Sequence, residues 1–306
     1  MARCRAGLPV GAPKAQGHEV SAPEARQLGV RSVEDVLRLP ADGQVDAKAL
    51  LLMPGRWERY DPFLLCSEDW FRRPGGFEAH PHRGFETITL VLDGQLEHVD
   101  SRGNRGVLGP GEVQWMTAGS GVVHSELPHG SSRVHSLQLW LNLPPAEKMA
   151  EPGYQDLRTS AIPIHKSGAV VTRVISGAQG GLTGPARNHV PALILEIRAL
   201  AGAAWSIDVP EGYAGFVYLL AGEGRFGADA VRASDGQVVW MMPAQENAPF
   251  PITAHTALQL FVAAGPPIGA PVVAEGPFVM NTREQILEAV RDYRAGKFGT
   301  IPKARA

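Results

Sequence analysis

The sequence predicts an all-β protein made of two stacked antiparallel β-barrels with one helix near the C-terminus. Three observations support this fold class. Glycine and proline are frequent, at 35 and 25 of 306 residues, and they recur in turn signals such as Gly109-Pro110-Gly111. Between the turns lie short runs of alternating or β-branched and aromatic character. Similar strand–turn segments occur at 87–98 and at 215–227, which indicates a duplicated barrel.

The predicted strands fall into two blocks separated by a glycine-rich stretch near residues 161–184. The clearest runs are TITLVL (87–92), VQWM (113–116), SLQLWLNL (136–143), ALILEIRAL (192–200), GFVYLL (215–220) and LQLFVAAG (258–265). Short strands bounded by turn residues at this spacing are typical of antiparallel barrels or sandwiches. We therefore predict the following division: an N-terminal extension at 1–44, a first barrel at 45–160, a connecting segment at 161–184, and a second barrel with the terminal helix at 185–306.

The N-terminal extension is expected to be flexible. Its first 17 residues are basic, contain no acidic residue and lack the apolar segment of a signal peptide. A transit peptide is the alternative. Within the rest of the extension, SVEDVLRL (32–39) has a helical pattern with Ser32 as N-cap, so a short helix is predicted there.

The terminal helix follows Asn281. Thr282 and Gln285 have the spacing of a capping box, and Gly296 can end the helix. The apolar face expected to pack on a barrel consists of Ile286, Leu287 and Val290.

Composition excludes several classes of protein. The net charge is −2, and the 29 Lys and Arg are scattered among 31 Asp and Glu, so direct nucleic-acid binding is not expected. No apolar run approaches the roughly 20 residues that span a bilayer, and no membrane association is expected. Cys4 and Cys66 lack CxxC spacing, which argues against a disulfide framework and fits a reducing, cytoplasmic compartment. Cys66 is expected to be a small buried apolar residue.

Two pairs of residues carry metal-ligand chemistry. His80 and His82 flank Pro81, which favours an extended backbone at a barrel rim. Residues i and i+2 of a strand point to the same face, so the two imidazoles lie side by side. His124 and Glu126 form a second pair at the same spacing.

Two strands that each offer two inward ligands can supply four groups to one ion. Imidazole and carboxylate suit Fe(II), Mn, Ni, Cu or Zn, and the lack of thiolate disfavours a structural zinc site. The alternative for one such histidine pair is a surface or packing role, but the second pair in the same block favours the metal. Glu86 is the rival carboxylate, because continuous strand parity would place it on the face of His80 and His82. It could be a fifth ligand, a hydrogen-bond acceptor for an imidazole or a solvated strand residue.

Three segments resemble the signature segments of the pirin family, in the cupin superfamily. They are RPGGFEAHPHRGFETITLVLDG (73–94), DSRGNRGVLGPGEVQWMTAGSGVVHSE (100–126) and GPFVMNT (276–282). The resemblance runs from about residue 61 to the helix after Asn281. It implies a bicupin with one iron in the N-terminal barrel, held by His80, His82, His124 and Glu126. Glu86 would then lie beside the ligands.

The resemblance also implies a C-terminal barrel without metal, and this barrel has only the unpaired His189 and His255. His98, His129 and His135 are not expected to be ligands. For His98 we expect a half-exposed strand or loop position, with a place at the pocket mouth as the alternative.

Pirin-like proteins include quercetin 2,3-dioxygenases, which open the central ring of a flavonol with O₂ and release carbon monoxide. The leading expectation is therefore a dioxygenase with one divalent transition metal, foremost Fe(II), that takes a small aromatic substrate and O₂. Glu126 is expected to be the catalytic general base. A flat aromatic substrate would be accepted by an apolar wall, for which the candidates are Phe85, Leu90, Trp115 and Met116; the alternative for each is simple core packing.

The alternative is an iron-dependent, redox-sensing regulator that acts by binding a protein partner, as the animal pirin is described. Candidate segments for such a partner surface are RWERYDPF (56–63) and WFRRPGG (70–76), with packing at the rim as the alternative. A third hypothesis is a metal-binding cupin whose substrate is not a flavonol.

Overall fold

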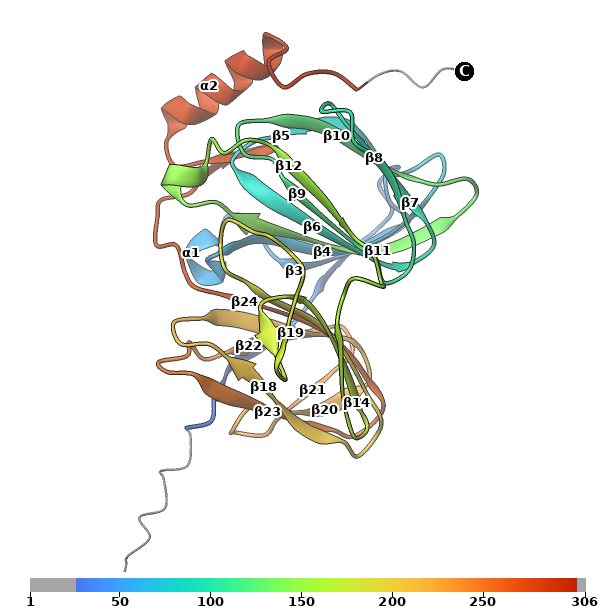
Figure 1. Ribbon diagram of the computed structural model, residues 1–306, viewed down its shortest axis with the longest axis vertical. Coiled ribbons are helices and arrows are strands. Elements are labelled where there is room, and N and C mark those ends of the chain that lie inside the picture. Colours follow the sequence, from blue (N-terminus) through green and yellow to red (C-terminus); the bar gives the residue numbers. More distant parts are fainter. Residues whose placement is uncertain (1–25, 302–306) are drawn as a thin grey trace, which may run out of the picture.

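The structure is a computed structural model that describes residues 26–301, and its fold is all-β with two stacked units (Figure 1). In each unit a seven-stranded antiparallel sheet faces a four-stranded one. The predicted fold of two stacked antiparallel β-units is confirmed. Each unit is a flattened sandwich and not a closed barrel, because its two sheets share no continuous hydrogen-bonded edge. We call them the N-terminal and the C-terminal sandwich. The basic first 17 residues and Cys4 lie outside the described residues.

The N-terminal sandwich contains residues from β2 to β12. Its large sheet has the order β12 (Gly153–Leu157), β9 (Val113–Thr117), β6 (Phe85–Asp93), β11 (Arg133–Asn142), β4 (Phe63–Arg72), β3 (Ala47–Leu52) and β2 (Leu37–Leu39). Its small sheet has the order β5 (Phe77–His82), β10 (Val122–Pro128), β7 (Leu96–Asp100) and β8 (Arg105–Leu108). The short helices α1 (Trp57–Tyr60) and η1 (Pro145–Glu147) flank it.

The C-terminal sandwich repeats this plan. Its large sheet has the order β1 (Val30–Asp35), β22 (Gln237–Met241), β19 (Ala214–Ala221), β24 (Leu258–Gly265), β17 (Leu193–Ala199), β14 (Val170–Ser176) and β13 (Ile164–Ser167). Its small sheet has the order β18 (Ala204–Val209), β23 (Ala248–Ala254), β20 (Glu223–Phe226) and β21 (Val231–Ser234). Outside the four sheets lie two hairpins, β15 (Ala178–Gln179) with β16 (Leu182–Thr183) and β25 (Val273–Glu275) with β26 (Phe278–Met280).

The two strand orders match position by position, which agrees with the predicted duplication. The order β9-β6-β11-β4 corresponds to β22-β19-β24-β17, and β5-β10-β7-β8 corresponds to β18-β23-β20-β21. The similar sequence segments 87–98 and 215–227 fall on β6–β7 and on β19–β20. Strands β13 and β14 lie within the predicted connecting segment and belong to the C-terminal sheet.

The predicted helix at residues 32–39 is wrong, because this segment forms β1 and β2. β1 pairs with β22 of the C-terminal sandwich, whereas β2 pairs with β3 of the N-terminal one. Val30 and Val33 of β1 pack against the C-terminal core. The two sheet edges present unpaired N–H and C=O groups, and each strand gains main-chain hydrogen bonds by pairing with one of them. This gain exceeds the weak helical preference of the segment. The end of the predicted extension is thus ordered and links the two sandwiches.

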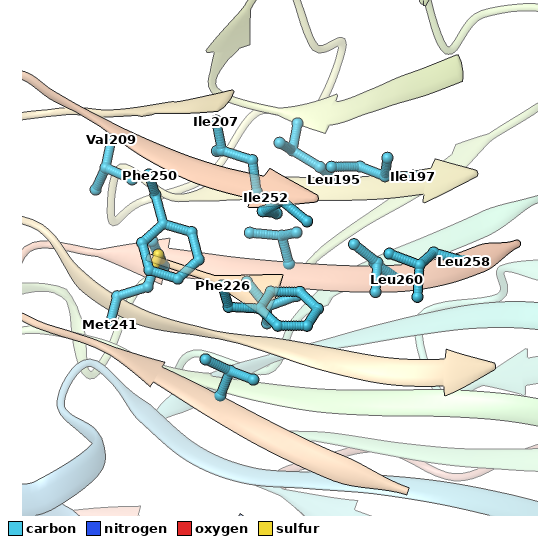
Figure 2. Close-up of a cluster of buried hydrophobic side chains, with 14 of the residues drawn as sticks. Leu195, Ile197, Ile207, Val209, Phe226, Met241, Phe250, Ile252, Leu258 and Leu260 are labelled. Carbon is cyan, nitrogen blue, oxygen red and sulfur yellow. The ribbon is translucent and has the colours of Figure 1, made fainter. Parts of the chain in front are cut away.

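Apolar side chains fill the C-terminal sandwich. Figure 2 shows this cluster, in which Phe226 and Phe250 of the small sheet meet Leu195 and Leu260 of the large one. A second cluster lies between the two large sheets and contains Trp115 and Leu139 from one unit and Phe216 and Trp240 from the other. Cys66 is buried in this inter-unit cluster, as expected. The two sandwiches are therefore stacked through the backs of their large sheets.

The terminal helix α2 (Arg283–Arg294) begins with the predicted capping box of Thr282 and Gln285. Ile286 is buried and Val290 is partly buried, but Leu287 is 48% exposed, so its predicted burial is wrong. Ala289 lies on the buried face instead, because the contact follows the spacing i, i+3, i+4 and position i+1 points about 100° away. Within the described residues no helix is long and apolar enough to cross a membrane.

Candidate metal centre

Three of the predicted ligands converge at one end of the small N-terminal sheet. β5 and β10 are antiparallel neighbours, and their register places His124 opposite His80. The Nε2 atom of His80 lies 3.0 Å from Nε2 of His82 and 3.0 Å from Nε2 of His124. Two ligand atoms bound at right angles, about 2.1 Å from one ion, lie about 3.0 Å apart. The three nitrogens thus fit three ligand positions of a single metal ion.

Hydrogen bonds on the opposite ring nitrogens set the tautomers of two of these imidazoles. Nδ1 of His80 lies 2.7 Å from the carbonyl oxygen of Glu78, and Nδ1 of His82 lies 3.4 Å from that of Pro277. A carbonyl oxygen can only accept, so both Nδ1 atoms carry the proton and donate it. The Nε2 lone pairs then face each other, an arrangement that a bound cation stabilises.

Burial keeps two of the imidazoles neutral. His82 is 2% exposed and His124 is fully buried, whereas His80 is half-buried at the rim. Burial, followed by the neighbouring imidazole of His80, holds the pKa of His82 well below its usual range. The pKa of His124 is lowered in the same way, by burial and then by His82 and His80. Near neutral pH these two rings therefore carry no positive charge that would oppose the binding of a cation.

Glu126 lies beside His124, one member of this trio, and is held by two hydrogen bonds. Its Oε1 accepts from the hydroxyl of Thr89 at 2.8 Å, and its Oε2 accepts from Nε2 of Gln138 at 2.7 Å. Ligand atoms of Glu126, His124 and His98 all lie within 4.8 Å of one another. A carboxylate has about four lone-pair sites, so the two hydrogen bonds leave capacity for a metal bond. Neither Thr89 nor Gln138 was singled out from the sequence, because both belong to other strands.

Glu86 lies on the wrong face of its strand to be a ligand. β6 begins after a break at Arg83 and Gly84, where Gly84 has φ +90°, so the strand parity of β5 does not continue into β6. Ile88, on the same face of β6 as Glu86, packs in the inter-unit cluster. Oε1 of Glu86 accepts from the hydroxyl of Thr117 at 2.7 Å. Among the two carboxylates considered, only Glu126 adjoins the histidines.

His98 is fully buried, so the expected half-exposed position is wrong. Its Nδ1 lies 3.5 Å from Nδ1 of His124, and its ring lies against that of Tyr154 with centroids 5.0 Å apart. Leu96, His98 and Asp100 alternate along β7, and all three are buried. This alternation could have predicted from the sequence that His98 points into the sandwich. His98 thus contacts the candidate ligand His124 at Nδ1, on the side of the ring opposite the Nε2 atom that faces His80.

His135, His189 and His255 lie apart from this centre. Nε2 of His135 lies 2.7 Å from Oε1 of Glu68. Among the described residues, two groups of His and Glu side chains could hold a metal ion, and both belong to the N-terminal sandwich. His189 pairs with Glu147 and His255 with Glu223 at the surface.

An aromatic pair borders the candidate centre. Phe85 and Trp140 are stacked with ring centroids 4.3 Å apart, and each ring lies within about 5 Å of that of His82. Of the four residues expected to line a substrate pocket, only Phe85 adjoins the histidines. Leu90 and Trp115 pack between the sandwiches, and the remaining residue, Met116, packs against Ala118 and Val122.

Comparisons with known proteins agree with the resemblance noted in the sequence. The family model described as Pirin matches residues 55–141, and the one described as Pirin C-terminal cupin domain matches residues 194–299. Pirin of Rattus norvegicus is 40% identical over 250 residues, which cover 78% of this chain and 83% of the rat protein. The chain belongs to the pirin family.

Solved structures of similar proteins share this bicupin fold. GK1651 from Geobacillus kaustophilus is 44% identical, with a TM-score of 0.78 over 81% of this chain and 100% of that one. A quercetin 2,3-dioxygenase from Acinetobacter baumannii is 30% identical, with a TM-score of 0.83 over 90% of this chain and 100% of that one. The cluster of His and Glu side chains in this pirin-family chain indicates a site for a single metal ion.

Proposed function

We propose that this pirin-family protein is a metal-dependent dioxygenase that opens the central ring of quercetin-type flavonols with O₂. The observation that carries the proposal is the convergence of three imidazole Nε2 atoms, two of them on rings kept neutral by burial, beside the restrained carboxylate of Glu126. The likeness to a quercetin 2,3-dioxygenase at 30% identity supports the same substrate class.

The donor set proposed to hold the metal is His80, His82, His124 and Glu126. Nitrogen and carboxylate donors without thiolate suit Fe(II), which we propose as the resident ion, and they also accept Mn, Ni, Cu or Zn. Four ligands leave two positions of an octahedral ion for other groups. When bound, the metal supplies Lewis acidity that lowers the pKa of a hydroxyl group of the substrate.

Glu126 is proposed as the general base that takes this hydroxyl proton. Thr89 and Gln138 hold the two carboxylate oxygens, so the base is oriented before substrate binds. The half-buried His80 marks the exposed side of the centre, from which a substrate can approach. Phe85 and Trp140 give the neighbourhood of His82 an aromatic character that suits a flat ring system.

The test is turnover of quercetin by protein loaded with Fe(II) under anaerobic conditions and then exposed to O₂. We expect release of carbon monoxide. Glu126→Gln keeps the size of the side chain and one oxygen but removes the base, and it should lower turnover by a factor of ~10² to 10⁴. Glu288→Gln, which removes an exposed charge on α2, is the matched control and should leave turnover unchanged. A fully loaded wild-type protein that releases no carbon monoxide would overturn the proposal.

A second candidate function is the redox-sensing regulator, favoured by a groove at the surface between the sandwiches. Arg31, Trp57 and Arg59 line this groove together with Pro267 and Pro271. Arginine and aromatic side chains are enriched in protein-binding sites. A pull-down from cell extract with the Fe(II) and the Fe(III) protein tests it: a partner retained in only one state supports the regulator, and identical results in both states exclude it.

A further inference from the structure

The chain returns to the N-terminal sandwich after the C-terminal sandwich is complete. Residues 273–299, which we call the C-terminal strap, contain the hairpin β25–β26, helix α2 and Phe298. Figure 1 shows α2 on the N-terminal unit, at the end away from the C-terminal unit. Phe278, Ile286 and Phe298 of the strap form one buried cluster with Val123, the neighbour of His124 on β10.

The strap contacts the main chain that carries His82. Pro277 offers its carbonyl oxygen to Nδ1 of His82 at 3.4 Å. The next residue, Phe278, forms a parallel bridge with Arg83, and the N–H of Val279 donates to the carbonyl oxygen of Arg83 at 3.0 Å. This approach is so close that a Cβ at Gly84 would lie 2.1 Å from the carbonyl oxygen of Val279. The strap therefore fixes the ring of His82 at the end of β5 and the backbone of the two residues that follow it.

Two buried basic side chains, Arg83 and Lys148, hold the strap in this place. The guanidinium of Arg83 is 2.9 Å from Asp292 of α2 and lies 4.6 Å from the ring centroid of Phe298. Lys148 donates to the carbonyl oxygens of Gly84 at 2.8 Å and Val279 at 2.9 Å, so one amine ties both sides of the contact together. Both anchors lie outside the cluster of candidate ligands.

We propose that the C-terminal strap is a working part of the metal centre, with Pro277 as a positioning residue for His82. The carbonyl of Pro277 holds the proton of His82 on Nδ1 and turns Nε2 toward His80 and His124. Loss of such a hydrogen bond behind a ligand typically weakens metal binding by about 10- to 100-fold. Metal binding and docking of the strap are then coupled, and the coupling is reciprocal. The inference rests on the metal-binding part of the proposed function and is independent of the substrate.

The test measures Fe(II) affinity by competition with a chromophoric chelator, without any turnover assay. Asp292→Asn weakens the contact of the strap helix α2 with Arg83, and Lys148→Met weakens the contact of the strap hairpin at Val279. We expect each variant to bind Fe(II) about ten-fold more weakly or worse than wild type. Glu288→Gln, on the exposed face of α2, is the matched control and should keep the wild-type affinity.

A second measurement separates coupling from a merely structural role. In the wild-type protein, Fe(II) should slow amide hydrogen exchange across residues 277–299, because a bound ligand strengthens the docking that it depends on. If exchange in the strap is independent of Fe(II), and the two variants bind Fe(II) like wild type, the inference is wrong while the metal centre stands. If wild-type protein binds no Fe(II), the metal centre and this inference both fall. Absence of carbon monoxide in the turnover assay affects only the proposed dioxygenase activity.

Discussion

Burial of Lys148 makes the free energy of unfolding of this protein depend on pH in the alkaline range. The size of this dependence can be calculated from the structure. The side chain of Lys148 is 1% exposed and donates to three oxygens, those of Gly84, Val279 and the Asn142 amide. None of these partners is charged, so burial of the ammonium is not offset by a carboxylate. Burial lowers the pKa of Lys148 from 10.5 to about 7.

The sign of the effect follows from the two pKa values. Between pH 7 and 10.5 the unfolded chain holds the Lys148 proton and the folded chain releases it, so the free energy of unfolding rises with pH. From pH 7 to pH 9 this one group contributes a gain of about 2 kcal/mol. Below pH 7 both states are protonated, and the cost of burying the charge is present in full without further pH dependence.

The perturbation is Lys148→Met, which keeps an unbranched side chain one heavy atom shorter and removes the titrating group. Urea unfolding followed by tryptophan fluorescence, at pH 7 and at pH 9 without metal, gives the free energy of unfolding of wild type and variant. We expect the difference between the two proteins to change by about 2 kcal/mol in favour of wild type at pH 9. Lys166→Met, at an exposed position on β13, should follow the wild-type pH profile. Parallel profiles for wild type and Lys148→Met would refute the reasoning, because the buried amine would then have an ordinary pKa.

Two further predictions concern the two sandwiches. His82→Ala should lose most of the bound metal, measured as metal per chain after gel filtration, while far-ultraviolet circular dichroism stays that of the wild type. His255→Ala, outside the candidate centre, should keep full loading, and equal loading of both variants would exclude His82 as a ligand. Phe226→Ala empties part of the apolar interior in Figure 2 and should lower the free energy of unfolding by about 3–5 kcal/mol. The metal content per chain of Phe226→Ala should remain that of wild type. A loss of metal would show that the metal centre of the N-terminal sandwich depends on the packing of the C-terminal one.

Features that depend on neighbouring residues in the chain could be predicted from the sequence. His80 and His82 share a face because they are two residues apart on one strand, and the same parity applies to His124 and Glu126 on β10. The capping box of α2 is equally local, and it was predicted at the residue where the helix begins. The strand duplication was visible because corresponding strand–turn segments have similar patterns.

Features that depend on pairing between distant segments required the tertiary structure. Parity suggested Glu86 as a ligand, but the turn at Gly84 resets the alternation, and only the packed sheets show which face of β6 meets the histidines. Residues 32–39 form strands because two sheet edges need partners, and no local pattern states where those edges lie. The carbonyl of Pro277 reaches His82 across 195 positions of the chain. A contact of this kind is created by the packing of the strap. The sequence by itself determined the two pairs of candidate ligands, and the fold decided which groups surround and orient them.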